Sequence, residues 1–513
     1  MLKDGKILVG RSSQGKDTVL LPKMANRHGL IAGATGTGKT VTLKVLAESF
    51  SDLGVPVFLA DVKGDLSGMI KPGSGMEERV SALSLEGFAY KNYPAVFWDI
   101  YGQSGIPLRT TISEMGPLLL TRILGLNDLQ GDILTVAFKI ADDEGLLLTD
   151  TKDLKALLNY ISENNKDLAA EYGKMSPVSI SAILRAVVAL EMAGGETFFG
   201  EPALSIHDLI SLGTEGRGTV NILDSKSLIQ NSTLYSMFLL WLLSELFENL
   251  PEVGDLDKPK FVFFFDEAHL LFKGTPSPLL EKIEQVVKLV RSKGVGIYFI
   301  TQNPRDIPDG VLAQLGNRIE HALHAYTPAE QKSVKAAAAS FRENPEFDTY
   351  EAIMGLGTGE AVISLLGEDG APSVAEMATI LPPQSALGEA DDASKNAAVK
   401  GSILYSKYAQ AVDNDSAYEF LQRRGLEAQA AADKEAADVA AAKEKEKAQA
   451  KADKEKQARE KRVTKNIGHA VTGTVGREIG KAAGSPFGKI GKRLGGNVGA
   501  SLGRGLLDTL FKL

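Results

Sequence analysis

The segment that most constrains this chain is glycine-rich and lies between an apolar run and an amphipathic one: GATGTGKT, residues 33–40. It matches G-x-x-x-x-G-K-[ST] at every fixed position. Glycines let a backbone curl until successive N–H groups point at one phosphate, and the following helix presents its positive N-terminal end to the same anion. We therefore expect a phosphate-binding loop with Lys39 at the β- and γ-phosphates and Thr40 at a Mg²⁺ position. The expected nucleotide-binding residues are Gly33, Ala34, Thr35, Gly36, Thr37, Gly38, Lys39, Thr40 and Val41.

A second motif lies far downstream, where five apolar residues, 261–265, are followed by Asp266 and Glu267. A continuous apolar run of this length is typical of a strand that is buried on both faces of a parallel sheet. An acidic pair at its end predicts a Mg²⁺ ligand, Asp266, and a base for the attacking water, Glu267. The alternative is an ordinary polar strand end.

Three further strand ends carry polar residues of interest. Asp61-Val-Lys63-Gly-Asp65 follows the strand predicted over 55–61, where a ligand loop and a solvated turn are equally compatible with the sequence. Gln302 lies at the tip of the strand predicted within 294–304, where an amide could sense the γ-phosphate or hold water; a simple turn residue is the alternative. Arg318 lies near the start of a strand predicted within 316–328.

Alternating strand and helix patterns predict an α/β fold with a mostly parallel sheet and helices on both faces. We expect one large domain over residues 1–390, with a helical insertion at 110–212 where strand patterns are scarce. Residues 391–424 form a connecting segment, and 425–462, rich in Ala, Glu and Lys, predict a solvated helix. A basic, glycine-rich tail follows at 463–513.

Composition narrows the chemistry and the compartment. The chain has no cysteine, which excludes thiolate metal sites and fits a cytoplasmic location, and it has no apolar stretch long enough to span a membrane. Net charge is −8, but residues 461–513 contribute +8, so the remainder is −16. Such an acidic body is unlike a constitutive nucleic-acid binder. In the tail, glycines at four-residue spacing fit close helix contact, membrane-surface binding or a disordered segment.

The order of these motifs resembles the HerA/FtsK-type P-loop ATPases: GATGTGKT, then DVKGD, a strand ending in DEAH, then RSKGVGIYFITQNP and GNRI. The resemblance covers residues 1–390 and implies a RecA-like core that binds ATP and Mg²⁺. It also implies a homo-oligomeric ring, usually hexameric, with ATP at subunit interfaces. The catalytic residues it implies are Lys39, Glu267, Gln302 and an arginine acting in trans, for which Arg318 is our first choice and Arg291 the second. The family's N-terminal β-barrel is not expected within the 27 residues before His28.

The resulting hypothesis is an ATP hydrolase that moves a polymer through a ring, most plausibly double-stranded DNA. Two alternatives stay open: a remodelling or secretion-type ATPase that acts on a protein partner, and a membrane-tethered scaffold switched by nucleotide.

Overall fold

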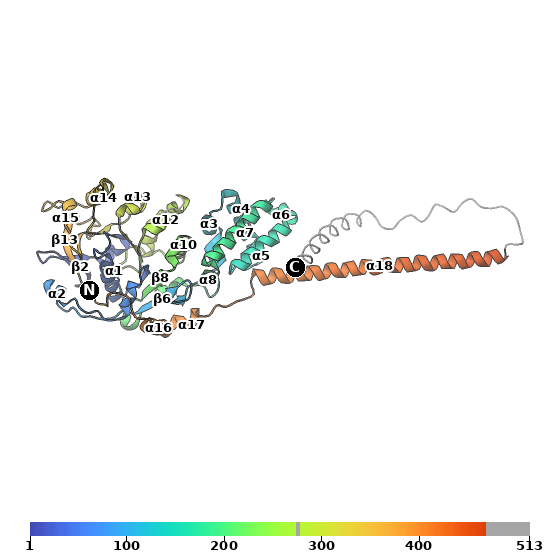
Figure 1. Cartoon of the computed structure of the whole chain (residues 1–513), viewed down its shortest axis with the longest axis horizontal. Coiled ribbons are helices and arrows are strands. Elements are labelled where there is room, and N and C mark those ends of the chain that lie inside the picture. Colours follow the sequence, from blue (N-terminus) through green and yellow to red (C-terminus); the bar gives the residue numbers. More distant parts are fainter. Residues whose placement is uncertain (273–276, 468–513) are drawn as a thin grey trace. The chain divides into compact units, whose positions relative to one another are not determined.

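The computed structural model describes residues 1–272 and 277–467 (Figure 1). The chain divides into two compact units, Met1–Glu427 and Ala428–Leu513. Most of the tail predicted at 463–513 lies outside the described residues.

One sheet of 13 strands organises the first unit. Its order is β1-β2-β13-β12-β11-β4-β10-β9-β5-β8-β6-β7, with β3 paired to β2. Neighbouring strands are parallel from β11 to β7, which confirms the mostly parallel α/β sheet, and antiparallel from β11 to β1. The strands are β1 Leu2–Lys3, β2 Lys6–Arg11, β3 Asp17–Leu20, β4 Gly29–Ala32, β5 Val57–Asp61, β6 Ala95–Asp99, β7 Ile106–Pro107, β8 Val220–Asp224, β9 Phe261–Phe265, β10 Val295–Thr301, β11 Asn317–His321, β12 Glu360–Ser364 and β13 Glu376–Ile380.

Helices cover both faces of this sheet, and aromatic contacts show which helix covers which face. Phe50 of α1 (Lys39–Asp52) packs on Phe264, with ring centroids 6.2 Å apart. The preceding residue, Phe263, points to the other face and stacks on Phe58 at 4.7 Å. Phe58 in turn contacts Phe238 of α10 (Ser232–Asn249) at 6.1 Å. The central strand β9 is therefore buried between two helical layers, as its unbroken apolar sequence predicts.

Among the remaining helices of the sheet-bearing part, α12 joins the central strands β9 and β10 and packs against α10. The others follow strand ends or connect the antiparallel strands, and α16 and α17 lie within the connecting segment expected at 391–424. The bounds of these helices are α2 Glu77–Ala82, α11 His269–Phe272, α12 Ser277–Val290, α13 Asp309–Leu312, α14 Pro328–Ala339, α15 Thr349–Gly355, α16 Asp392–Gly401 and α17 Ile403–Tyr408.

Helices replace strands between β7 and β8, in the region expected as an insertion. Capping boxes at Thr111, Asn127 and Asp150 begin three of these helices, because each side chain accepts a backbone N–H of the first turn. The longest unbroken apolar run of the chain is too short to span a membrane, but the segment 177–198 passes the test by overall length and composition alone, as core helices of other proteins also do. The helices are α3 Ile112–Ile123, α4 Asp128–Glu144, α5 Thr151–Glu163, α6 Asn165–Tyr172, α7 Pro177–Leu190, α8 Glu196–Phe198 and α9 Ile206–Leu209.

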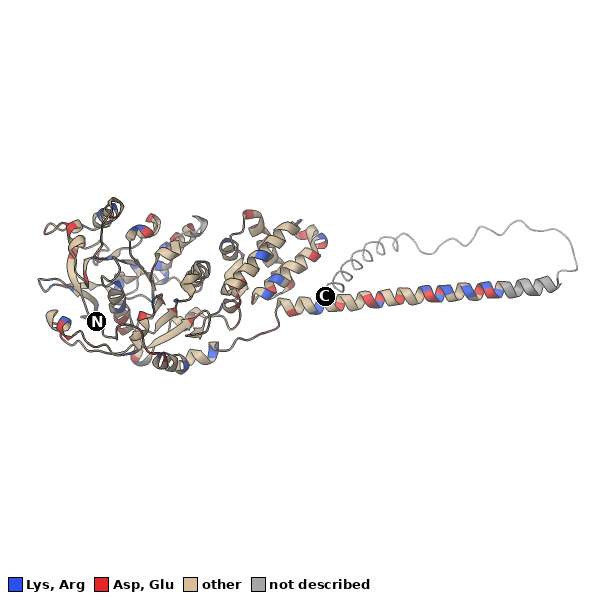
Figure 2. Ribbon diagram, in the orientation of Figure 1, with Lys and Arg blue, Asp and Glu red and all other residues tan. Residues whose placement is uncertain are grey.

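A single long helix, α18, runs from Ala417 to Ile467. The sequence predicts a solvated helix over 425–462. Every side chain from 433 to 457 is exposed, and Figure 2 shows acidic and basic residues mixed along this part of α18. Few large apolar residues occur here, so this part of the helix has no face with which to form a core.

Candidate nucleotide-binding site

The glycine-rich loop joins β4 to α1 and turns sharply between them. Gly33 and Gly38 have φ of 148° and 119°, conformations that residues with side chains rarely adopt. A Cβ at Gly33 would lie 2.5 Å from the Cβ of His321, and one at Gly38 would lie 3.2 Å from the Cα of Gly359. The loop backbone is thus packed closely against the last residue of β11 and the residue that precedes β12.

The lysine of the motif lies inside this loop. Lys39 Nζ donates to the carbonyl oxygens of Gly33 (2.6 Å) and Ala34 (2.9 Å), and Thr37 Oγ1 also donates to Ala34 (2.8 Å). Burial lowers the pKa of Lys39, an effect that the negative charge of Glu267 opposes. Gly38 precedes α1 without a side-chain cap, which leaves the first-turn N–H groups available to an anion.

His321, which the sequence analysis does not single out, connects the P-loop helix to β12. Its Nδ1 donates to the carbonyl of Glu360 (2.9 Å), so Nε2 accepts the hydroxyl hydrogen of Thr42 (2.8 Å). Burial lowers the pKa of His321 to about 4, which keeps the ring neutral. Only its place at the carboxyl end of a strand could have suggested this residue from sequence.

The acidic pair lies at the end of β9, two strands from the P-loop strand across β10. Asp266 is buried, and its Oδ1 accepts the backbone N–H of Glu267 at 2.9 Å. Burial, together with the charge of Glu267, raises the pKa of Asp266 to about 6, whereas Lys63 opposes the rise. A cation beside Asp266 would favour its charged form in the same way.

The carboxylate of Glu267 contacts side chains from both neighbouring strand ends and that of His269, two residues further along the chain. The φ of Glu267 is 48°, and its carboxylate lies 3.3 Å from Lys63 Nζ, 3.3 Å from Gln302 Nε2 and 3.4 Å from His269 Nδ1. The Oε1 of Gln302 in turn accepts the hydroxyl hydrogen of Thr35 at 3.4 Å. Gln302 therefore connects the P-loop to the acidic pair, while Arg318 and Arg291 are not part of this cluster.

The two candidate arginines differ in their surroundings. Arg318 donates from Nε to the carbonyl of Leu315 (3.2 Å) and from Nη2 to that of Leu312 (3.3 Å). Arg291 follows α12, with 42% of its side chain exposed and Asp255 at 4.0 Å. The guanidinium of Arg318 is thus engaged within its own chain, whereas that of Arg291 is accessible.

The donors near the P-loop fit a metal that is held partly by phosphate. Thr40 is the second residue of α1 and has a half-buried side chain, and Asp266 supplies a carboxylate directly after β9. No group of three or more His, Cys, Asp or Glu among the described residues could hold a metal by protein ligands alone. One hydroxyl and one carboxylate are the protein ligands that a Mg²⁺ bound to nucleotide phosphates needs.

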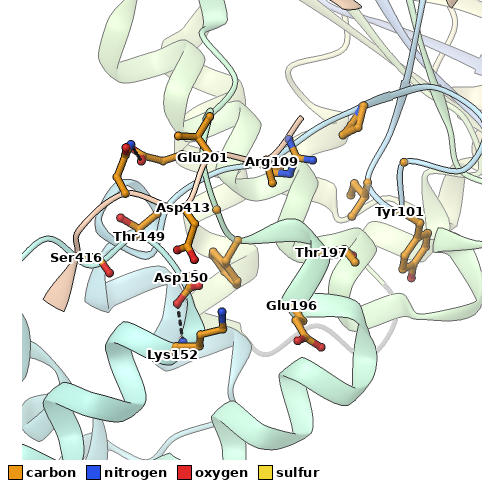
Figure 3. A pocket seen from close by; sticks show the side chains of 18 of the residues that line it. Tyr101, Arg109, Thr149, Asp150, Lys152, Glu196, Thr197, Glu201, Asp413 and Ser416 are labelled. Atoms are coloured by element: carbon orange, nitrogen blue, oxygen red, sulfur yellow. Dashed lines mark hydrogen bonds between the residues drawn. The ribbon is translucent and has the colours of Figure 1, made fainter. Parts of the chain in front are cut away.

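A separate pocket of about 510 Å³ lies elsewhere in the first unit (Figure 3). It is lined by the loop after β6, the start of α5, residues 196–201 and the segment 409–416. The lining contains two basic side chains, Arg109 and Lys152, and more acidic ones, among them Asp150, Glu201 and Asp413. None of its lining residues belongs to the P-loop or to the cluster around Glu267.

With this geometry established, comparison with known proteins gives the family. The model of the family described as "Helicase HerA-like C-terminal" matches residues 6–506. The chain belongs to the helicase HerA-like C-terminal family. The resemblance drawn from the motifs is thereby confirmed.

Two curated relatives of this HerA-like chain come from archaea. The DNA double-strand break repair helicase HerA of Sulfurisphaera tokodaii is 23% identical over 350 residues, which cover 66% of this chain and 62% of that protein. The DNA import protein CedB of Sulfolobus acidocaldarius is 24% identical over 352 residues, covering 67% and 51%. The chain therefore spans less than two thirds of the length of either relative.

Among solved structures, the plasmid coupling protein TrwB in complex with a non-hydrolysable ATP analogue has a TM-score of 0.52 and 15% identity. The match covers 76% of this chain and 94% of that chain. TrwB in complex with ADP and Mg²⁺ matches with a TM-score of 0.50 and 15% identity, over 77% and 92% of the two chains. These similarities confirm the expected RecA-like P-loop fold of the HerA-like chain.

Proposed function

We propose that this HerA-like chain hydrolyses ATP and uses the hydrolysis to move along double-stranded DNA as a ring of identical subunits. The observation that carries the proposal is the placement of Glu267, which reaches the P-loop through Gln302 and Thr35. A base at this position can act on water beside a phosphate that the P-loop holds.

Each residue at this edge has a role in the proposal. The N–H groups of 33–41 and the ammonium of Lys39 bind the phosphates, Thr40 and Asp266 hold Mg²⁺, Glu267 takes the proton of water and Gln302 senses the γ-phosphate. Mg²⁺ supplies the charge that offsets the phosphates. For the arginine acting in trans, exposure favours Arg291 over Arg318, whose donors are engaged within its own chain.

DNA as the polymer rests on the relatives, both of which are named for action on DNA. A cytoplasmic location is part of the same proposal. The charge of −16 over residues 1–460 favours a second candidate, a motor that acts on a protein, because an acidic body repels DNA phosphates outside any basic channel.

Steady-state ATP hydrolysis with and without long duplex DNA distinguishes these candidates. We expect wild type to hydrolyse ATP faster with DNA, and the gain to fall steeply with salt because phosphate contacts release counterions. Lys39→Ala should lack hydrolysis in both cases, because it removes the ammonium that binds the phosphates. A wild-type rate that DNA does not change would favour the protein-directed motor, and absence of hydrolysis would contradict both candidates.

A further inference from the structure

Lys63, at the end of a neighbouring strand, contacts the carboxylate of Glu267. It follows β5, which pairs in parallel with β9, so the two strand ends share one edge of the sheet. Its Nζ is 3.3 Å from Glu267 Oε1. Asp61 accepts the N–H groups of Gly64 (2.6 Å) and Leu66 (3.2 Å), which fixes the turn that carries Lys63. The backbone position of Lys63 is therefore fixed by the fold.

We propose that Lys63 restrains Glu267 until a phosphate of the bound polymer draws the lysine away. The inference rests on the proposed ATPase and adds to it the residue that makes hydrolysis depend on the polymer. In these terms Lys63 is a positioning residue, because it acts on the reaction through Glu267.

The contacts of Glu267 explain why Lys63 restrains it. Gln302 approaches both carboxylate oxygens, at 3.3 and 3.4 Å, and His269 contacts Oε2. These contacts occupy three of the roughly four lone-pair positions of the carboxylate, so when Lys63 also contacts Oε1, water has to displace a donor before it can be deprotonated. Unlike Gln302, which also contacts Thr35, Lys63 can leave Glu267 without breaking the link to the P-loop.

Exposure explains why a polymer can release the restraint. The side chain of Lys63 is 46% exposed, whereas that of Glu267 is 9% exposed. Lysine is a flexible point charge that pairs readily with phosphate, and an ion pair of this exposure is weak. A polyanion at the carboxyl edge of the sheet can therefore compete for Lys63 but cannot reach Glu267 itself.

Replacement of Lys63 by methionine tests the restraint, because methionine keeps much of the length and removes the charge. In the absence of DNA, Lys63→Met should hydrolyse ATP about three- to fivefold faster than wild type, with KM for ATP unchanged. DNA should then stimulate it less than it stimulates wild type. Lys63→Arg should keep the wild-type behaviour, because it preserves the charge.

A matched control is Lys71→Met, which removes an ion-paired lysine of similar side-chain exposure, 41%. Lys71 lies in the same segment between β5 and β6 as Lys63. The DNA-free rate of Lys71→Met should equal that of wild type. A DNA-free rate of Lys63→Met that is equal to or lower than wild type, in a variant that melts like wild type, would overturn the restraint. A faster DNA-free rate with an unchanged DNA stimulation would overturn release by phosphate.

These outcomes are separable from the proposed function itself. If DNA does not stimulate wild type, DNA is the wrong polymer and release by its phosphates is overturned as well. The DNA-free comparison of Lys63→Met with wild type still decides whether Lys63 restrains Glu267.

Discussion

The neutral ring of His321 shows how a single residue supports the nucleotide site. It accepts the hydroxyl hydrogen of Thr42, in the first turns of the P-loop helix, and donates to the backbone of β12. A protonated ring would have a hydrogen on each nitrogen, and the hydroxyl of Thr42 would then accept a hydrogen bond and no longer donate one. Burial lowers the pKa of His321 and so disfavours this charged form, which means that a neutral ring anchors the P-loop helix.

Stability should depend on pH through this ring. Burial lowers the pKa of His321 to about 4, whereas an unfolded histidine titrates near 6.5, so the unfolded chain binds an additional proton between these values. The stability that the neutral ring contributes is fully present above pH 6.5 and is lost as pH falls towards 4. Between pH 7.5 and 5 we expect wild type to lose about 2 kcal/mol of unfolding free energy more than His321→Gln, measured by urea unfolding. Equal losses in the two proteins would show that the ring is protonated in the folded state.

Sequence could predict the residues whose chemistry is local in the chain. The P-loop glycines and lysine, and the acidic pair after an apolar strand, follow each other at fixed spacing, so the pattern names them. His321 and Thr42 are 279 positions apart and meet only because β11 pairs with β4. Lys63 was visible as part of a strand-end turn, but its contact with Glu267 depends on β5 and β9 being neighbours.

At the scale of elements, a carboxylate ties the helical insertion to the connecting segment. Asp153, in the first turn of α5, is fully buried. It accepts the N–H groups of Thr149 (2.8 Å), Asp150 (3.0 Å) and Tyr418 (2.8 Å) and the hydroxyl hydrogen of Ser416 (2.6 Å). The side chain of Asp153 thus holds the start of α18 against the helical insertion.

Removal of this carboxylate should loosen the junction. We expect Asp153→Ala to cost about 3 kcal/mol of unfolding free energy, because buried donors lose a charged acceptor. Asp150→Ala, which loses only the cap of α5, should cost about 1 kcal/mol. Urea unfolding measures both, and proteolysis within 409–416 should speed up in the first variant. A cost for Asp153→Ala no greater than that for Asp150→Ala would contradict this role.

Sequence predicts elements well where their periodicity is strong and poorly where a strand is very short or polar. The buried strands and the insertion helices carry continuous or amphipathic patterns. β13 and the two-residue strands β1 and β7 do not, because strands this short or this polar are defined by their partners. Asn317 shows the same limit: its side chain donates to Met24 and His28 and accepts from Leu366, a structural role in GNRI that the motif alone does not reveal.

At the scale of the whole molecule, the parallel half of the sheet brings the phosphate loop, the acidic pair and Lys63 to one edge. A motor has to couple that edge to a polymer, and in this account Lys63 makes the coupling. Hydrolysis alone does not show movement, so the central claim needs a measurement of displacement along DNA.

The most direct measurement is ATP-dependent displacement of a third strand from a triplex at the far end of a long duplex. The account predicts displacement by wild type with ATP, none with a non-hydrolysable analogue, and none by Glu267→Gln, which keeps the shape of the side chain but cannot accept the proton of water. ATP hydrolysis by wild type that leaves the triplex intact, under conditions in which the protein binds the duplex, would contradict the claim that this chain moves along DNA.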